Sequence, residues 1–191
     1  MLKTSTMKKM ILVTFLFTIA FIVQNNAARA QSITSEQIKA QMVADWQRAK
    51  AYTVDYLNIM PADKYSFQPV DSIKRSFAQQ MLHLASGNIL LMSKATDAKT
   101  PSFFGYDIEH SAGAQSKDSV MYYVTASYDY CINAVQNSDV NKWGEMPDGF
   151  GMKVTRYALM NKAFEHQTHH RGQCTIYLRL QGIRPPQERL F

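Results

Sequence analysis

The spacing of apolar residues is the strongest constraint on the fold, because it repeats with a helical period in four stretches of the chain. In the third stretch, from near Ser116 to near Asn137, the inward positions recur at i, i+4, i+7, i+11 and i+14. These positions are Val120, Val124, Ser127, Cys131 and Ala134. Such spacing places all of them on one face of an α-helix. No stretch shows a convincing strand alternation, so the pattern predicts an all-α protein.

Capping residues and prolines delimit the first two helices. The first is expected to open at Thr34 or Ser35 and to stop before Pro61. The second is expected to start with Ser76 as its N-cap, with a glutamine three residues later as in a capping box, and to run to about Ala95. Apolar residues wrap almost the whole circumference of this second helix. We therefore expect it to be the most buried of the four.

The fourth helix is expected from about Thr155 to Gln181, where Gly182 suits a left-handed stop and two prolines bar continuation. Four helices of roughly twenty residues without strands favour a four-helix bundle. The connection between helices 2 and 3, residues 96–115, is long enough to cross the bundle. Residues 61–76 and 139–152 are the other two connections, each rich in loop-forming residues.

Residues 1–30 have the layout of a cleavable secretory signal. Three lysines precede a run of fourteen mostly apolar residues, Met10 to Val23, and Ala28-Arg29-Ala30 offers small residues at the cleavage positions. A membrane anchor is the alternative, but a span needs about twenty apolar residues. The interpretation is a signal peptide at 1–30, a domain at 31–191, export to the periplasm and no stable membrane anchor.

Removing the signal changes the charge balance and excludes one class of partner. The chain has 21 basic and 15 acidic residues, and four of the basic ones lie within residues 1–30. The remaining 17 basic residues are spread along the chain, whereas nucleic-acid binding needs clustered Lys and Arg. We therefore expect no nucleic-acid partner. The two cysteines, Cys131 and Cys174, exclude a disulfide scaffold but leave a single bridge open.

The candidate chemistry is concentrated near the middle of the fourth helix. His166 and His170 are four residues apart and therefore lie about 40° apart on one helix face. Two imidazoles at this spacing can converge on one cation, as in zinc proteases. The same face carries apolar residues, so the pair is expected to point into the bundle. His169 falls about 60° to the side and is a poorer ligand.

A third ligand has to come from another helix, and His83 is the candidate. It lies in the middle of the apolar second helix, where a buried imidazole needs partners for its nitrogens. Gly87, one turn away, leaves room beside the ring. His110 lies in the crossover, and its direction cannot be read. The alternative is that His83 is a core histidine satisfied by a neighbouring side chain.

Three segments of the chain resemble the DinB-like family of metalloproteins, which includes YfiT-like thiol transferases. The string HQTHHRGQCTIYLRLQGIRPP, residues 166–186, is similar to the family's His-x-x-His-His-Arg-Gly-Gln signature and its Pro-Pro ending. SFAQQMLHLASGNILL, residues 76–91, is similar to the family's second helix, whose histidine aligns with His83. MPADKYSFQPV, residues 60–70, resembles the connection between helices 1 and 2.

The resemblance implies a four-helix bundle with a long second crossover and a metal held by His83, His166 and His170. Imidazole donors suit Zn, Ni, Co or Fe, and ligand type does not choose among these divalent ions. Members of the family range from thiol transferases to proteins without a known activity. A secretion signal departs from the cytoplasmic members and argues against a cytosolic thiol substrate.

Two classes of function remain open after the site is drawn. Three neutral histidines leave a coordination position free, which favours a metal-dependent transferase or hydrolase acting on a small molecule. The alternative is a non-catalytic metal- or ligand-binding bundle, because no general base is evident. Glu165 points about 100° away from the adjacent ligand, and Gln173 is interpreted as an ordinary polar residue. The sequence leaves a homodimer open.

Overall fold

All regular structure in the described part of the chain is helical. The computed structural model describes residues 32–70, 75–147 and 153–191. Its α-helices are α2 (Ser35–Ile59), α3 (Phe77–Thr96), α4 (Lys117–Gln136) and α5 (Arg156–Leu180), and short 3-10 turns lie at Ala62–Lys64, Ser102–Gly105, Ala112–Ala114 and Val140–Lys142. The proposed signal peptide lies outside the described residues. Within them, no helix is both long and apolar enough to cross a membrane.

The helix boundaries follow the local signals in the sequence. Ser76 caps α3 with a complete capping box, in which its hydroxyl accepts from the Gln79 amide while the Gln79 side chain accepts from the Ser76 amide. Ser116 and Thr155 cap α4 and α5 in the same position. After α5, Gly182 adopts a φ of 71°, a left-handed conformation that costs glycine little. The predicted helices are confirmed to within one or two residues.

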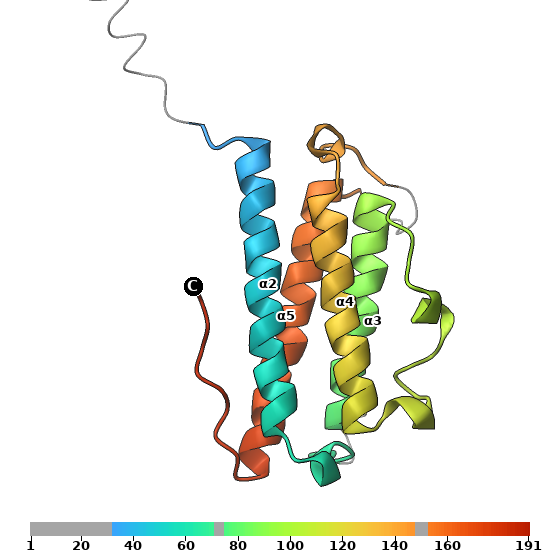
Figure 1. Ribbon diagram of the computed structural model, residues 1–191, viewed down its shortest axis with the longest axis vertical. Helices are drawn as coiled ribbons and strands as arrows, with labels where there is room; N and C mark the ends of the chain where they lie inside the picture. Colours follow the sequence, from blue (N-terminus) through green and yellow to red (C-terminus); the bar gives the residue numbers. More distant parts are fainter. Residues whose placement is uncertain (1–31, 71–74, 148–152) are drawn as a thin grey trace, which may run out of the picture. The chain divides into compact units, whose positions relative to one another are not determined.

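The direction of the helices explains the long crossover. Within Ser35–Phe191, α2 and α5 run one way and α3 and α4 run the other (Figure 1). Because α3 and α4 are parallel, the segment between them, residues 97–116, has to return along the length of the helices (Figure 1). The chain is therefore a four-helix bundle with one long crossover, as predicted, and it does not have the simple up-down-up-down order.

The core lies around α3, which packs against both α4 and α5. Eleven of its twenty residues are buried, and they point in several directions around the helix. Each large apolar side chain buried this way stabilises the fold by about 1.5–3 kcal/mol. This buried central helix carries His83, and α5, its neighbour, carries the other two candidate ligands.

Candidate metal centre

The bundle brings together the three histidines that the sequence singled out. His83 of α3 meets His166 and His170 of α5, and one ring nitrogen from each lies within 4.8 Å of the other two. The ring centroids are 5.4 Å apart for His83 and His166, 4.6 Å for His83 and His170, and 4.4 Å for His166 and His170. The i, i+4 spacing on α5 and the close packing of α3 against α5 produce this convergence.

Gly87 creates the space in which one of these rings lies. A Cβ atom built at Gly87 would be only 2.1 Å from Cε1 of His166, far inside van der Waals contact. The sequence suggested that this glycine makes room beside His83, one turn away on the same helix. The ring that comes closest instead belongs to α5, so the missing side chain of α3 lets the two helices share the site.

The two α5 histidines are neutral and incompletely satisfied. The Nδ1 atoms of His166 and His170 are buried and have no hydrogen-bond partner among the described residues. Burial, together with the charges of neighbouring histidines, lowers the pKa of His166 to about 4 and that of His170 to about 3. Both rings therefore keep a free lone pair at neutral pH, which is the state that binds a metal ion.

His83 differs from the α5 pair because its ring has a carboxylate partner. Its Nδ1 lies 2.7 Å from Oε2 of Glu109, whose other oxygen accepts a 2.7 Å hydrogen bond from Nε of Arg75. A guanidinium nitrogen of Arg75 is also 3.1 Å from the same Nδ1. An ionised carboxylate only accepts hydrogen bonds, so Nδ1 of His83 is the donor. The Arg75 contact to Nδ1 is then a close approach, and the lone pair of a neutral His83 ring lies on Nε2.

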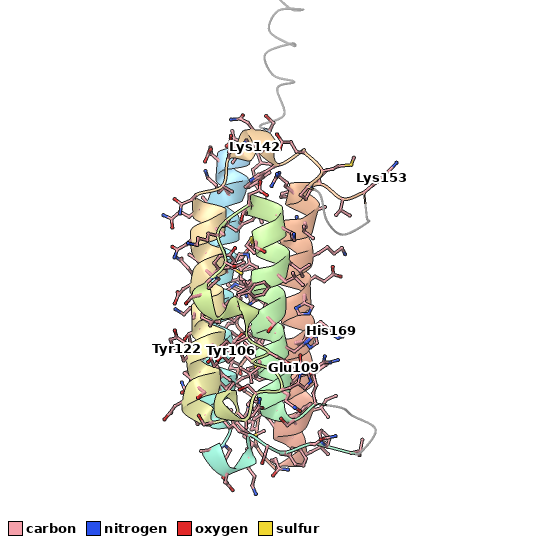
Figure 2. The ribbon with its side chains drawn as sticks, turned by 90° about the vertical axis from the view of Figure 1, so that its right-hand side faces the viewer. Tyr106, Glu109, Tyr122, Lys142, Lys153 and His169 are labelled. Carbon is pink, nitrogen blue, oxygen red and sulfur yellow. The ribbon has the colours of Figure 1, made fainter. Side chains whose placement is uncertain are left out.

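Glu109 is held in its ionised form. Burial by itself would raise its pKa, but hydrogen bonds from Arg75 and His83, with their charges, outweigh burial and lower the pKa below its usual value. Figure 2 shows Glu109 on the crossover in front of α3, at about the height of His169 on α5. The crossover therefore forms part of the wall of the histidine site.

The other candidate residues lie outside the cluster. His169 is exposed, and its Nε2 lies 3.0 Å from Nε2 of Gln173, a half-buried residue. His110 is exposed and pairs with Asp107 at 2.9 Å. Glu165 is exposed and forms an ion pair with Lys162, which lowers its pKa. The sequence-based expectation that Glu165 points away from the site agrees with this position.

The cysteines do not contribute to the cluster. Cys131 and Cys174 are both free and fully buried, so the disulfide that the sequence left open is not formed. Burial raises the pKa of each thiol well above its ordinary value. Both side chains behave as small apolar core residues.

Glu109 and Arg75 are the site residues that the sequence analysis missed. Glu109 lies in an irregular segment, 26 positions after His83, and Arg75 directly precedes the N-cap of α3. No helical spacing links either of them to a histidine. The sequence offers one signal for Glu109, its position in the crossover directly before His110.

The donor set fits one divalent metal ion. Three imidazoles, two with orphaned buried nitrogens and one paired with a carboxylate, match the ligands and supporting carboxylate of many transition-metal sites. The glycine that admits the His166 ring is further evidence of a built cradle. The fold and site together define a helical bundle with a three-histidine centre.

Sequence and structural comparisons identify the family. The DinB family pattern matches residues 31–189, and the chain belongs to this family. A DinB-like protein from Bacillus cereus is similar in structure, with a TM-score of 0.66 at 17% identity, covering 78% of this chain and 95% of that one. A DinB-like protein from Bacillus subtilis, YjoA, has a TM-score of 0.59 at 19% identity, covering 79% and 96%. No curated protein sequence matches the chain.

Proposed function

We propose that the protein binds one divalent metal ion through His83, His166 and His170. The observation that carries the proposal is the convergence of three imidazoles, two of which have buried Nδ1 atoms without a partner in the described structure. Leaving a buried polar atom unpaired costs about 1–3 kcal/mol, and a cation that takes up ring lone pairs would offset such a cost. Zn, Ni, Co and Fe all suit imidazole donors.

We further propose that the site acts as a metal-dependent transferase or hydrolase on a small molecule. A divalent ion held by three neutral ligands would supply Lewis acidity and an open coordination position. Arg75 and Glu109 neutralise one another beside His83, so the charge of the ion would stay uncompensated by the chain. Such a site suits a substrate that brings an anionic or electron-rich group.

A non-catalytic metal- or ligand-binding bundle is the second candidate, and one observation favours it. The carboxylate nearest the histidines, Glu109, already accepts from Arg75 and His83, and Glu165 is paired with Lys162 at the surface. Neither side chain is free to remove a proton from a substrate. The open coordination position supports the enzyme, whereas the engaged carboxylates support the binding role.

We also propose that the protein acts in the periplasm after removal of residues 1–30. The support is the pattern of basic, apolar and small residues in that segment. N-terminal sequencing of the protein purified from its native periplasm would detect a mature chain that begins at Gln31. An intact Met1 on the exported or cytosolic protein would contradict the cleavage.

Metal titration of histidine variants tests the site. Wild type should bind one equivalent of Zn²⁺ or Co²⁺, and His83→Ala and His170→Ala should each lose at least about 100-fold in affinity, because removing a ligand exceeds the 10–100-fold effect of removing a supporting group. His110→Ala and His169→Ala keep all three candidate ligands and are the comparison variants. They should lose much less affinity, although His110 lies 3.7 Å from Glu109 and the His169 ring packs 5.0 Å from that of His170. Stoichiometric metal retained in both ligand variants would refute the proposal.

Chelation separates the catalytic from the non-catalytic role. An enzyme should turn over a substrate in screens of thiol transfer and of ester or amide hydrolysis, and lose that turnover when the metal is removed. A binding bundle should show a large fall in melting temperature on chelation and no turnover. The His170→Ala protein is the control for effects of the chelator that do not involve the site.

A further inference from the structure

The crossover between α3 and α4 contributes a side chain to the histidine cluster. Glu109 is 13% exposed, although the segment around it lies on the outside of the helices. One of its oxygens is 2.7 Å from Nδ1 of His83, and the other is 2.7 Å from Nε of Arg75. Each carboxylate oxygen therefore has its own short contact, one to the candidate ligand and one to an arginine. Nε2 of the exposed His110 lies farther away, 3.7 Å from the oxygen that accepts from Arg75.

Arg75 is itself fixed by the helix that carries the other two histidines. The hydroxyl of Tyr177 on α5 donates a 2.8 Å hydrogen bond to the carbonyl of Arg75. Arg75 also directly precedes the N-cap of α3, so the capping box at Ser76 restrains its backbone. The contacts run from α5 through Arg75 and Glu109 to His83, whose ring meets His170 of α5 again.

We infer that Glu109, held by Arg75, is a positioning residue that fixes His83 as the Nδ1–H tautomer with its Nε2 lone pair turned toward His166 and His170. A free imidazole rotates and exchanges its proton between the two nitrogens. The carboxylate acceptor selects one tautomer and one ring orientation. Its role toward the metal rests on the proposed function, but the tautomer of His83 is a property of the metal-free chain.

The physical reason is a difference in how the three rings are restrained. His166 and His170 lie one turn apart on the same helix, and the ring of His166 fills the space that Gly87 leaves. His83 comes from the other helix and has a half-exposed side chain, at 30%. Burial alone does not hold its ring, so the carboxylate partner on Nδ1 provides the restraint.

Three variants test the inference. Glu109→Ala removes the acceptor, and Glu109→Gln keeps the shape without the charge. Asp107→Asn is the matched control, because Asp107 is an exposed carboxylate on the same segment and its partner, His110, comes no closer than 3.7 Å to Glu109. The readouts are the tautomer of His83 in the metal-free protein, from long-range ¹⁵N–¹H NMR, and Zn²⁺ affinity by competition with a chromophoric chelator. Neither readout depends on activity.

We expect wild-type His83 to be the Nδ1–H tautomer, and Glu109→Ala to shift it toward a mixture of the two. Zn²⁺ affinity should fall 10–100-fold in Glu109→Ala and less in Glu109→Gln, while Asp107→Asn changes neither readout. A wild-type tautomer in Glu109→Ala, a Zn²⁺ affinity within threefold of wild type, or an equal loss in Asp107→Asn would overturn the inference. If wild type binds no metal, the proposed function fails, and the tautomer alone decides the role of Glu109.

Discussion

Two neighbouring faces of α5 carry buried polar groups, and they differ in how those groups are satisfied. His166 and His170 face α3, and Gln167 and Arg171, each one residue later, are rotated by about 100° toward α2 and α4. Gln167 and Arg171 are as well buried as His170, with exposed fractions of 0%, 6% and 7%. Burial alone does not distinguish the two faces.

The face with Gln167 and Arg171 satisfies its polar groups from within the protein. Oε1 of Gln167 accepts from the Tyr128 hydroxyl at 2.8 Å and from Arg171 at 2.7 Å, and its amide nitrogen donates to the Phe164 carbonyl at 2.9 Å. The guanidinium of Arg171 also lies 4.7 Å from the ring centre of Tyr52. This set, which we call the Gln167 network, joins α5 to α2 and α4 and needs no ligand.

The histidine face has the opposite property. Nδ1 of His166 and Nδ1 of His170 are buried, and the described residues offer neither atom a partner. A complete buried network rigidifies a fold, whereas an incomplete one costs free energy unless something else binds. The two faces therefore differ in their unpaired atoms more than in burial, and the convergence of these atoms with His83 is what supports the proposed metal site.

The largest predicted effect comes from closing the space at Gly87. Gly87→Ala would bring a methyl group to about the position of the His166 ring, so the ring must move and metal binding should be lost. Overpacking of this kind costs about 1–3 kcal/mol. Urea denaturation and Zn²⁺ titration measure the two effects. Adding His166→Ala should remove the clash. The loss in free energy of unfolding of the double variant should then be smaller, by more than 1 kcal/mol, than the summed losses of the two single variants.

Gly172→Ala is the matched control for this prediction. Gly172 also lies within a helix, but a Cβ there would meet no atom within 4 Å. Alanine should stabilise the helix by about 0.5–1 kcal/mol relative to glycine and leave Zn²⁺ affinity unchanged. A Gly87→Ala protein that behaves like Gly172→Ala would show that His166 does not occupy the space on α3.

A smaller loss of stability is expected at low pH, and it should come from the histidine face of α5 only. In the metal-free protein the pKa values of His166 and His170 are about 4 and 3, against 6.5 in the unfolded chain. Between pH 6.5 and about 4 the unfolded chain binds protons that the folded chain does not, so stability falls as the pH falls. After allowance for partial solvent exposure, we expect a loss on the order of 2 kcal/mol between pH 7 and pH 5.

Urea denaturation of the metal-free protein at the two pH values measures this loss. The double variant His166→Gln/His170→Gln should be much less sensitive to acid. The Gln167 network cannot produce the effect, because burial raises the pKa of Tyr128 to about 12 and its arginine stays charged. An unchanged acid sensitivity in the double variant would assign the effect to other groups.

Local signals made the helices predictable, and tertiary contacts made parts of the site unpredictable. The N-caps Ser76 and Ser116 act within one helical turn, so sequence spacing reveals them. The pairing of His166 with His170 is equally local. Glu109 reaches His83 only because the crossover folds back along α3, and no periodicity encodes that return.

The Gln167 network escaped prediction for a related reason. Helical periodicity showed which face of α5 carries the histidines, but a long polar side chain at the next position is expected to reach solvent. Arg171 is buried because α2 supplies it with an oxygen acceptor and an aromatic ring. Another acceptor, Gln167, also accepts from Tyr128 of α4. Those partners become visible only when three helices are assembled.

The smallest effect that we predict tests whether the two faces of α5 are independent. Tyr128→Phe removes the hydroxyl that donates to Gln167 and lies 2.7 Å from Thr53, and it leaves Arg171 as the remaining donor to Gln167. We expect a loss of about 1–1.5 kcal/mol in stability. The hydrogen bonds of the hydroxyl to Gln167 and to Thr53 are both lost, but each of these residues keeps another partner. Zn²⁺ affinity should be unchanged, because the hydroxyl contacts the neighbouring face of α5, rotated by about 100° from the histidines.

Denaturation and metal titration of the same Tyr128→Phe sample separate these two outcomes. A loss of stability at constant Zn²⁺ affinity would mean that the two faces are independent. The Gln167 network would then stabilise the bundle without affecting metal binding by the histidines. A tenfold or greater loss of affinity would mean that Gln167, adjacent to His166 in the chain, transmits its position to the ring. The two faces would then form a single site built across α5, and the contrast between them would no longer separate structure from function.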